Sequence, residues 1–414
     1  MRAPRFLIAA AHKSSGKTII STGLAHALTA RGVKVAAFKK GPDYIDPMWL
    51  GAATGGPCYN LDFNTQTPDE IATFFAGRAK GQDVALVEAN KGLFDGVSMD
   101  GSDSNAAIAK RLDLPVILVI DTNGTTRGIA PLLQGYVAFD SQVNIAGVIL
   151  NKVGGPRHEQ KLREAVATYT DLPVIGAVQR NAALEIGERH LGLTTPSETG
   201  ELDALIARVG EIVGSGVDLD ALLGLADQAP DLPDPPVRPA LPKPDVTIAY
   251  ARDRAFGFYY PDDLEAFAEA GARLVPFDAM KDAALPQCDG LLIGGGFPEM
   301  FVPELTANES LRADIKARIE AGLPTYAECG GLMYLARSII GAAAAGEMVG
   351  VVPAQAVMHP RPQGRGYTAF RDSADHPWPG VPGKTAAHEF HYARLEALDG
   401  IPRYGREVVR GHGV

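Results

Sequence analysis

The sequence predicts an α/β protein of two domains, each built around a parallel sheet. In the first half of the chain, short apolar runs alternate with stretches whose apolar residues recur at helical spacing. A second series of this kind begins at Val246. The residues between the two series, 227–244, are rich in proline, which disfavours a helix or a central strand and favours an extended linker. We therefore expect domains at 1–226 and 245–414, joined by this linker.

The composition narrows the class of protein. The 414 residues are 46% hydrophobic and 21% charged, and no apolar run is long enough for a membrane span. The net charge of −10 argues against a nucleic-acid partner. Cys58, Cys288 and Cys329 lack the spacing of metal ligands, which argues against both a disulfide framework and a zinc site. We expect a cytoplasmic protein that binds neither membranes nor nucleic acid.

A candidate phosphate loop lies near the N-terminus. The apolar run 6–11 predicts a buried strand, a helical pattern follows residue 18, and the loop between them contains Gly16, Lys17 and Thr18. Backbone N–H groups at a helix N-terminus bind phosphate, Lys17 would reach the β- and γ-phosphates, and Thr18 would ligate Mg²⁺. The predicted ATP-binding residues are Lys13, Ser14, Ser15, Gly16, Lys17 and Thr18, of which Lys17 is also catalytic. Ala11 replaces the first glycine of the pattern, and an ordinary strand-to-helix turn is the alternative.

A second polar segment follows a predicted strand at 33–38. It reads Lys39-Lys40-Gly-Pro-Asp43-Tyr44-Ile-Asp46-Pro. Its lysines could hold phosphate or substrate carboxylates, and its aspartates could ligate Mg²⁺, whereas a solvated polar turn is the alternative. The candidate substrate-binding residues are Lys40, Asp43, Tyr44, Asp46 and, further along the chain, Asp95.

Glu88 ends the next predicted strand, 84–88. A carboxylate at the carboxyl end of a parallel strand beside a phosphate loop is where a further Mg²⁺ ligand would lie, although a strand-end carboxylate facing water is the alternative. The predicted metal ligands are therefore Thr18, Asp46 and Glu88. Further strands at 116–120, 145–150 and 174–178 complete a doubly wound sheet, and Asn151 after the second of these resembles a residue that binds the nucleotide base.

The second domain contains a candidate nucleophile. A predicted strand runs into Gly294, Gly295 and Gly296, whose backbone could approach a developing oxyanion. A short strand then leads to Cys329, and Gly330 begins a helix, an arrangement that resembles a nucleophile elbow. We expect the helix N-terminus to lower the pKa of the thiol and the N–H groups of Gly295, Gly296 and Gly330 to stabilise the oxyanion. An inert core cysteine is the alternative, and it is the reading we adopt for the other two cysteines.

These motifs resemble the cobyrinic acid a,c-diamide synthase family across nearly the whole chain. The matching motifs are Ser15-Gly-Lys-Thr18, Gly41-Pro-Asp-Tyr-Ile-Asp-Pro47, Glu88 with Gly92-Leu-Phe-Asp-Gly96, Gly294-Gly-Gly-Phe-Pro-Glu299, Ala327-Glu-Cys-Gly-Gly331 and His388-Glu-Phe-His-Tyr392. The resemblance implies a P-loop NTPase domain like that of dethiobiotin synthetase, acting as an ATP-dependent amidoligase, and a flavodoxin-like class I glutamine amidotransferase domain. It implies amidation of the a and c acetate groups of a corrinoid with ATP, Mg²⁺ and glutamine.

Two departures leave alternatives open. The family's general-base histidine is expected in a segment beyond residues 405–414, so either the sequence is incomplete there or the base is a nearby histidine, with His388 and His391 as the candidates and His412 as a third. His12-Lys13 and Phe38-Lys39-Lys40 resemble the branch that amidates sirohaem, so sirohaem or nickel-sirohydrochlorin is the alternative substrate. A nucleotide-dependent partitioning or scaffold protein is the alternative class, although it needs no thiol nucleophile. A homodimer is a further expectation.

Overall fold

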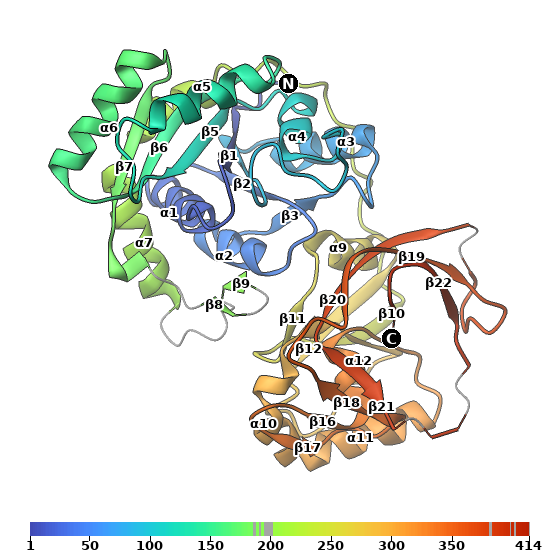
Figure 1. Ribbon diagram of the computed structural model, residues 1–414. Coiled ribbons are helices and arrows are strands. Elements are labelled where there is room, and N and C mark those ends of the chain that lie inside the picture. The colour runs from blue at the N-terminus through green and yellow to red at the C-terminus, as the bar shows by residue number, and fades with distance from the viewer. Residues whose placement is uncertain are drawn as a thin grey trace. The chain divides into compact units, whose positions relative to one another are not determined.

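The computed structural model describes residues 1–184, 188–189, 192–193, 202–380, 383–397, 399–400 and 403–413. They form two compact units, 1–238 and 239–414, which follow each other along the colour scale of Figure 1. The assignment of separate functions to 1–226 and 245–414 stays a prediction. Within the described residues, no helix combines the length and apolar character needed to cross a membrane.

The first unit is built on a seven-stranded parallel sheet. From one edge to the other, its strands are β3 (Cys58–Leu61), β2 (Val35–Lys40), β4 (Val84–Glu88), β1 (Arg5–Ala10), β5 (Val116–Asp121), β6 (Ile145–Val153) and β7 (Val174–Gln179). Every residue of β1 and β4 is buried, because helices cover both faces, and this explains their continuous apolar runs. The predicted doubly wound α/β class is confirmed, although β3 was not predicted.

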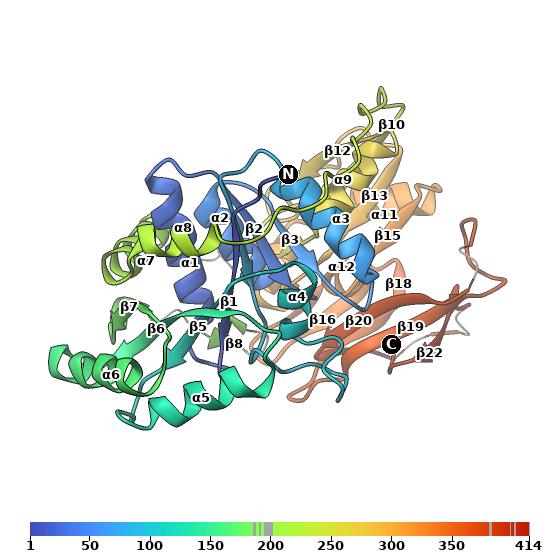
Figure 2. The same ribbon diagram turned by 90° about the horizontal axis from the view of Figure 1, so that it is seen from above.

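Helices cover both faces of this sheet, as Figure 2 shows for α1, α2 and α7 on one side and α4 to α6 on the other. The helices are α1 (Lys17–Ala30), α2 (Ile45–Thr54), α3 (Pro68–Ala79), α4 (Asn105–Arg111), α5 (Ile129–Phe139), α6 (Pro156–Tyr169), α7 (Leu202–Gly216) and α8 (Leu219–Ala226). A short helical turn at Ala182–Leu184 and the strand pair β8 (Glu188–Arg189) and β9 (Gly192–Leu193) complete the unit. Residues of α3 to α6 share one hydrophobic core with the sheet.

The order of the strands determines where a ligand site forms. β2, β3 and β4 lie on one side of β1, whereas β5, β6 and β7 lie on its other side. The direction of winding therefore reverses at β1. Ligands of such sheets bind outside the carboxyl ends of the strands where the direction of winding reverses. The loops that follow β1, β2 and β4 meet at that edge, and they carry most of the site residues predicted from the sequence.

The second unit begins with a smaller parallel sheet. Its strands, in spatial order, are β12 (Ala272–Phe277), β10 (Val246–Ala251), β13 (Gly290–Ile293) and β15 (Thr325–Ala327), and a short antiparallel pair, β11 (Phe256–Phe258) and β14 (Gly295–Gly296), adjoins them. The helices are α9 (Pro261–Glu269), α10 (Val302–Ala307), α11 (Glu309–Glu320) and α12 (Gly330–Leu335), with a helical turn at Pro298–Met300. This part has the predicted α/β character.

The sequence patterns did not predict the strands after residue 335. One four-stranded sheet has the order β17 (Ala345–Glu347), β16 (Ala336–Ile340), β18 (Val352–Met358) and β21 (Ala393–Glu396). An antiparallel three-stranded sheet has the order β20 (Thr385–His391), β19 (Gly364–Asp372) and β22 (Arg406–Arg410). The strands of this second sheet are largely half-buried or exposed, so they lack the apolar runs that identify buried strands.

Candidate functional site

The phosphate loop connects β1 to α1 through residues 11–16. Ser14 and Gly16 have positive φ values of 66° and 87°. A Cβ atom on Gly16 would lie 2.3 Å from Nδ2 of Asn151, so only glycine fits there. Ala11, which replaces a glycine of the common pattern, is not among the residues with positive φ, and alanine is therefore compatible with this turn.

Side chains from the end of β6 support this loop. Asn151 is buried and donates from Nδ2 to the carbonyl oxygen of Ser15 at 2.8 Å. Lys152 donates to the carbonyl oxygen of Ser14 at 3.1 Å and pairs with Asp121 at 2.7 Å. Asn151 therefore holds the loop, a contact that the sequence did not predict, while its role at a nucleotide base stays a prediction. Lys13 is exposed on the same loop.

A buried group of charges lies beside the phosphate loop. Lys39, which is 2% exposed, directs its Nζ to Oδ2 of Asp46 at 2.5 Å and to Oε1 of Glu88 at 2.9 Å. Thr18 donates from its hydroxyl to the same Glu88 oxygen at 2.9 Å. The structure thus brings the three predicted metal ligands together beside one lysine. Glu88 ends β4, and Thr18 and Asp46 lie in the first turns of α1 and α2.

The electrostatics of this group follow from its burial. Burial raises the pKa of Glu88, although the positive charge of Lys39 opposes this rise. Burial, with Lys39 nearby, lowers the pKa of Lys17 to about 8. Oε2 of Glu88 is buried, and no group of the described residues forms a hydrogen bond with it. A carboxylate oxygen whose lone pairs accept no hydrogen bond, next to a threonine hydroxyl, is a suitable ligand for a Mg²⁺ ion.

The sequence patterns predicted Lys39 only as a possible cation for phosphate or a substrate carboxylate, and they did not predict its ion pairs with Glu88 and Asp46. They predicted that the strand ends at Phe38 and named Lys40 as the substrate-binding lysine. That boundary is wrong, since β2 continues through both lysines. Successive strand residues point to opposite faces, so only one of the two can reach Glu88. Lys40 is equally buried, and burial lowers its pKa, with Asp62 and Asp103 opposing this. No property of the two adjacent lysines in the sequence shows which of them points to the carboxylates.

The Lys39→Met variant should lower the free energy of unfolding of the first unit. Loss of the ammonium leaves the buried carboxylate of Glu88 and the half-buried carboxylate of Asp46 without their counter-charge, and removal of one partner of a buried ion pair typically costs about 3–5 kcal/mol. Denaturant unfolding would measure the change, with Lys34→Met as the control because Lys34 is exposed just before the same strand. A loss as small as that of the control would contradict the counter-charge role.

The remaining predicted residues of this edge shape the loops. Oδ1 of Asp43 accepts hydrogen bonds from the backbone N–H groups of Ile45 and Asp46 at 2.9 and 3.0 Å, and burial raises the pKa of Asp43 to about 7. Tyr44 is half-buried just before α2. Asp95 is exposed and accepts from the N–H of Gly92 at 2.9 Å. Contacts of these residues with a substrate stay predictions.

Cys329 occupies the turn between β15 and α12. Its φ of 49° and ψ of −113° are strained for a residue other than glycine, as at a nucleophile elbow. The turn is tight, since a Cβ on Gly331 would lie 2.2 Å from the carbonyl oxygen of Ile293. Cys329 is exposed, whereas Cys58 is buried and Cys288 is half-buried. The geometry therefore matches the elbow that the sequence predicts.

The triple-glycine loop lies next to this turn. A Cβ on Gly295 would approach the Cβ of Cys329 to 3.4 Å, and one on Gly296 would overlap the carbonyl oxygen of Ala255 at 1.9 Å. Backbone N–H groups of Gly296 and Gly330 act on the thiol by hydrogen bonding and favour its anion. The structure thus brings together the three glycines predicted to form an oxyanion site, Gly295, Gly296 and Gly330, around Cys329.

The expected lowering of the Cys329 pKa is wrong. Although the residue as a whole is exposed, the protein packed around its thiol raises the pKa to about 11, and the carboxylates of Glu328 and Glu299 raise it further, against the backbone N–H groups. Helix α12 has only six residues, so its dipole offers little compensation. The thiol is therefore protonated near neutral pH, and attack on a substrate requires a base.

The three candidate bases lie on or near β20 and β22. The His388 ring lies 6.4 Å from the Tyr260 ring, measured between centroids. His391 bonds to the carbonyl oxygen of Ala393 through Nδ1 at 2.9 Å and faces Glu389. His412 bonds to the same glutamate at 3.2 Å. These contacts do not identify a base for Cys329, so the assignment to His388 or His391 stays a prediction.

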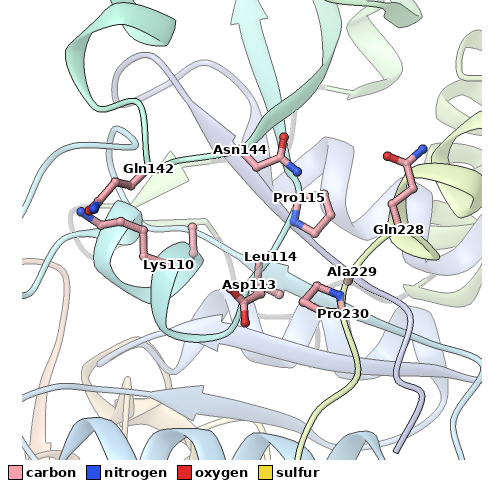
Figure 3. Close-up of a pocket in the computed structure, with 10 residues that line it drawn as sticks. Lys110, Asp113, Leu114, Pro115, Gln142, Asn144, Gln228, Ala229 and Pro230 are labelled. Carbon is pink, nitrogen blue, oxygen red and sulfur yellow. The ribbon is translucent and has the colours of Figure 1, made fainter.

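A separate pocket of about 350 Å³ lies in the first unit (Figure 3). Its lining residues precede β5 and β6 or follow α8, so it opens at the amino ends of the strands, opposite the phosphate loop. They are Ala109, Lys110, Asp113, Leu114, Pro115, Gln142, Asn144, Gln228, Ala229 and Pro230. The lining includes none of the residues predicted to act on a substrate, and we assign it no part in the candidate site.

Family models cover both units. Residues 6–193 match the CobQ/CobB/MinD/ParA nucleotide binding domain, and residues 247–412 match the CobB/CobQ-like glutamine amidotransferase domain. Fold and site therefore define an enzyme of the glutamine-dependent ligase class with a nucleotide-binding domain. The chain belongs to the cobyrinate a,c-diamide synthase family, because it is similar over its whole length to curated members.

Three relatives illustrate this similarity. The cobyrinate a,c-diamide synthase of Magnetococcus marinus is 45% identical over 100% of this chain and 90% of its own. The enzymes of the same name from Dehalococcoides mccartyi and Listeria monocytogenes are 41% and 40% identical over 98% and 99% of this chain, and over 89% and 92% of their own lengths. A solved structure of chloroplast FtsY from Physcomitrella patens covers 50% of this chain and 66% of its own with 19% identity, and its TM-score of 0.32 is too low to define a shared fold.

Proposed function

We propose that this enzyme amidates the a and c acetate carboxylates of cobyrinic or hydrogenobyrinic acid, with ATP as phosphoryl donor and glutamine as nitrogen source. One observation carries the proposal: the same chain combines a phosphate loop beside the buried carboxylate of Glu88 with an exposed cysteine, Cys329, at a strand-to-helix turn. Similarity to cobyrinate a,c-diamide synthases supports the substrate. Residues 1–226 would then form the amidoligase and 245–414 the class I glutamine amidotransferase.

Activation of the carboxylate is the first step. A carboxylate is a poor electrophile, so its oxygen attacks the γ-phosphorus of ATP, ADP leaves, and an acyl phosphate forms. Ammonia then attacks the acyl carbon and phosphate leaves, which gives the amide. Lys17 stabilises the charge on the transferring phosphoryl group, and the N–H groups of residues 13–18 hold the other phosphates. Asn151 is proposed to contact the base of ATP.

Thr18, Asp46 and Glu88 would hold Mg²⁺, which neutralises phosphate charge when it is bound. Oε2 of Glu88 supports this assignment, since among the described residues it is buried without a partner. Lys39 would keep both carboxylates in place through its ion pairs at 2.5 and 2.9 Å. The residues proposed to bind the tetrapyrrole are Lys40, Asp43, Tyr44, Asp46 and Asp95, and among them Lys40 supplies the cation for a substrate carboxylate.

Glu88→Gln and Asp46→Asn should each lower the amidation rate and raise the Mg²⁺ concentration needed for half-maximal activity. An amide is a weaker ligand than a carboxylate, so we expect each variant to need about tenfold more Mg²⁺ or more, in line with typical losses at metal sites. Isothermal titration of Mg²⁺ with ATP present gives a readout independent of turnover.

Asp171→Asn is the control for this pair, because Asp171 is an exposed aspartate before β7, remote in sequence from the loops of the site. If both test variants match this control in rate and in Mg²⁺ affinity, neither carboxylate ligates the metal.

Release of ammonia from glutamine is the second reaction, and it takes place at Cys329. The Cys329 sulfur attacks the side-chain amide carbon, ammonia leaves, and water hydrolyses the resulting thioester to glutamate. The N–H groups of Gly295, Gly296 and Gly330 stabilise the oxyanion at each step. Because the thiol pKa is raised, a base must take its proton, and His388 or His391 is proposed for that role.

Assays with individual tetrapyrroles test the substrate. With ATP, Mg²⁺ and glutamine, cobyrinic or hydrogenobyrinic acid should change in mass by the difference between a hydroxyl and an amino group at two carboxyls. Amidation of sirohaem or nickel-sirohydrochlorin in their place would support the proposed reaction but contradict the proposed substrate. ATP hydrolysis without amidation of any tetrapyrrole would favour a partitioning or scaffold protein. A homodimer without nucleic acid stays a prediction that size measurements in solution would check.

A further inference from the structure

Tyr259, which lies between β11 and α9, has a hydroxyl group that joins two parts of the second unit. We propose that Tyr259 is a positioning residue for glutamine hydrolysis, because this hydroxyl holds the loop 294–296 against Cys329. The role rests on the proposed function of Cys329 as the nucleophile. It adds a residue to that site which neither the glycine motif nor the cysteine motif contains.

The Tyr259 hydroxyl makes two hydrogen bonds. It donates to the carbonyl oxygen of Ala251 at 2.6 Å and accepts from the backbone N–H of Gly294 at 2.9 Å. Ala251 ends β10, and Gly294 directly follows β13, its neighbour in the parallel sheet. The hydroxyl therefore ties together the carboxyl ends of two adjacent strands, which is the edge where α/β sheets carry their sites.

The Tyr259 ring fits closely against the glycine that it holds. A Cβ atom on Gly294 would lie 2.6 Å from Cε1 of the ring, so any larger residue would displace one of the two. The ring also packs edge-on against Tyr250 at 5.5 Å between centroids. Burial raises the pKa of the phenol, which therefore stays neutral and can donate and accept at once.

Gly294 passes this restraint on to the nucleophile. Its carbonyl oxygen accepts from the N–H of Gly331 at 3.0 Å, immediately after the turn that carries Cys329. At the next residue, Gly295, an added Cβ atom would lie 3.4 Å from the Cβ of Cys329, so this part of the loop adjoins the cysteine. A shift of Gly294 would move both the turn and the N–H groups aimed at the oxyanion, and misplacement by about 1 Å can cost on the order of a hundredfold in rate.

The Tyr259→Phe variant tests this role, since it removes the hydroxyl and keeps the ring. We expect kcat for glutamine hydrolysis to fall about tenfold to a hundredfold, with KM for glutamine and the ammonium-driven amidation rate within about twofold of the unmutated enzyme. Tyr250→Phe is the matched control, because the Tyr250 hydroxyl accepts from Arg252 at 3.1 Å, whereas the N–H of Gly294 donates to the Tyr259 hydroxyl.

A glycine pair provides a second test that does not depend on how well Tyr259→Phe folds. In Gly294→Ala the new methyl group meets the Tyr259 ring, whereas in Gly290→Ala, at the start of the strand that precedes Gly294, the nearest atom would lie 3.6 Å away. The first should reproduce the loss of glutamine hydrolysis with ammonium-driven amidation kept, and the second should behave as unmutated enzyme.

The outcomes separate the two claims. If Cys329→Ser keeps glutamine hydrolysis, the proposed nucleophile is wrong, whatever the tyrosine variants do. If Cys329→Ser abolishes hydrolysis but Tyr259→Phe matches Tyr250→Phe, the positioning role of Tyr259 is overturned. An equal fall of the glutamine-driven and ammonium-driven rates in Tyr259→Phe would indicate a general structural role and would also overturn it.

Discussion

Cys329→Ser should lower glutamine-driven amidation by about a thousandfold or more and leave ammonium-driven amidation near the rate of the unmutated enzyme. The reason is that a serine hydroxyl has almost no anion near neutral pH and is a far weaker nucleophile than a thiol. Ammonium supplies directly the ammonia that Cys329 would otherwise release from glutamine. Amidation by the first unit therefore still has a nitrogen source. Parallel assays with glutamine and with ammonium, read by mass spectrometry of the tetrapyrrole, measure both rates.

Cys288→Ser is the matched control for this experiment. Cys288 is half-buried, and its sulfur accepts a hydrogen bond from Arg318 at 3.1 Å, which a serine oxygen can also accept. This variant should keep both activities. Loss of both activities in folded Cys329→Ser would place the thiol in the synthetase chemistry, and retention of both would make it a structural cysteine.

Lys17→Ala should lower amidation by about a thousandfold or more with either nitrogen source, because the phosphoryl transition state loses its main protein cation. Glutamine hydrolysis by the second unit need not change. The comparison requires ATP-dependent amidation and glutamine hydrolysis to be followed on the same sample.

Lys80→Ala controls for the removal of a lysine, since Lys80 is exposed at the end of α3. It should match the unmutated enzyme in both assays. Amidation at the control rate by Lys17→Ala, with ammonium and ATP, would show that the loop after β1 does not bind the transferred phosphoryl group.

Local motifs of the sequence predicted much of both sites. The loop with Gly16, Lys17 and Thr18 and the turn at Cys329 were predictable because each is defined by a few adjacent residues that need special backbone geometry. The buried strands were predictable because helices cover both faces of the sheet and leave continuous apolar runs.

Contacts between distant residues could not be predicted in this way. Lys39 pairs with Glu88 across 49 positions, and the choice between Lys39 and Lys40 depends on which face of β2 points to the neighbouring strand. The Cys329 pKa depends on burial and on Glu299, 30 positions away in the sequence. The prediction considered only the helix N-terminus, and it therefore gave the wrong direction for the pKa shift. Tyr259 meets Gly294 across 35 positions, and no pattern links them.

We propose that one chain transfers nitrogen from glutamine to a tetrapyrrole carboxylate through an acyl phosphate. The most direct measurement combines the enzyme with Mg²⁺, ATP, glutamine labelled with heavy nitrogen in its side-chain amide, and cobyrinic acid labelled with heavy oxygen in its carboxylates. Heavy nitrogen should appear in two amides of the product, and one heavy oxygen should appear in phosphate for each amide formed, because the acyl phosphate breaks between carbon and the labelled oxygen. Amides formed without heavy oxygen in the phosphate would contradict the acyl phosphate, and a product without heavy nitrogen would contradict glutamine as its source.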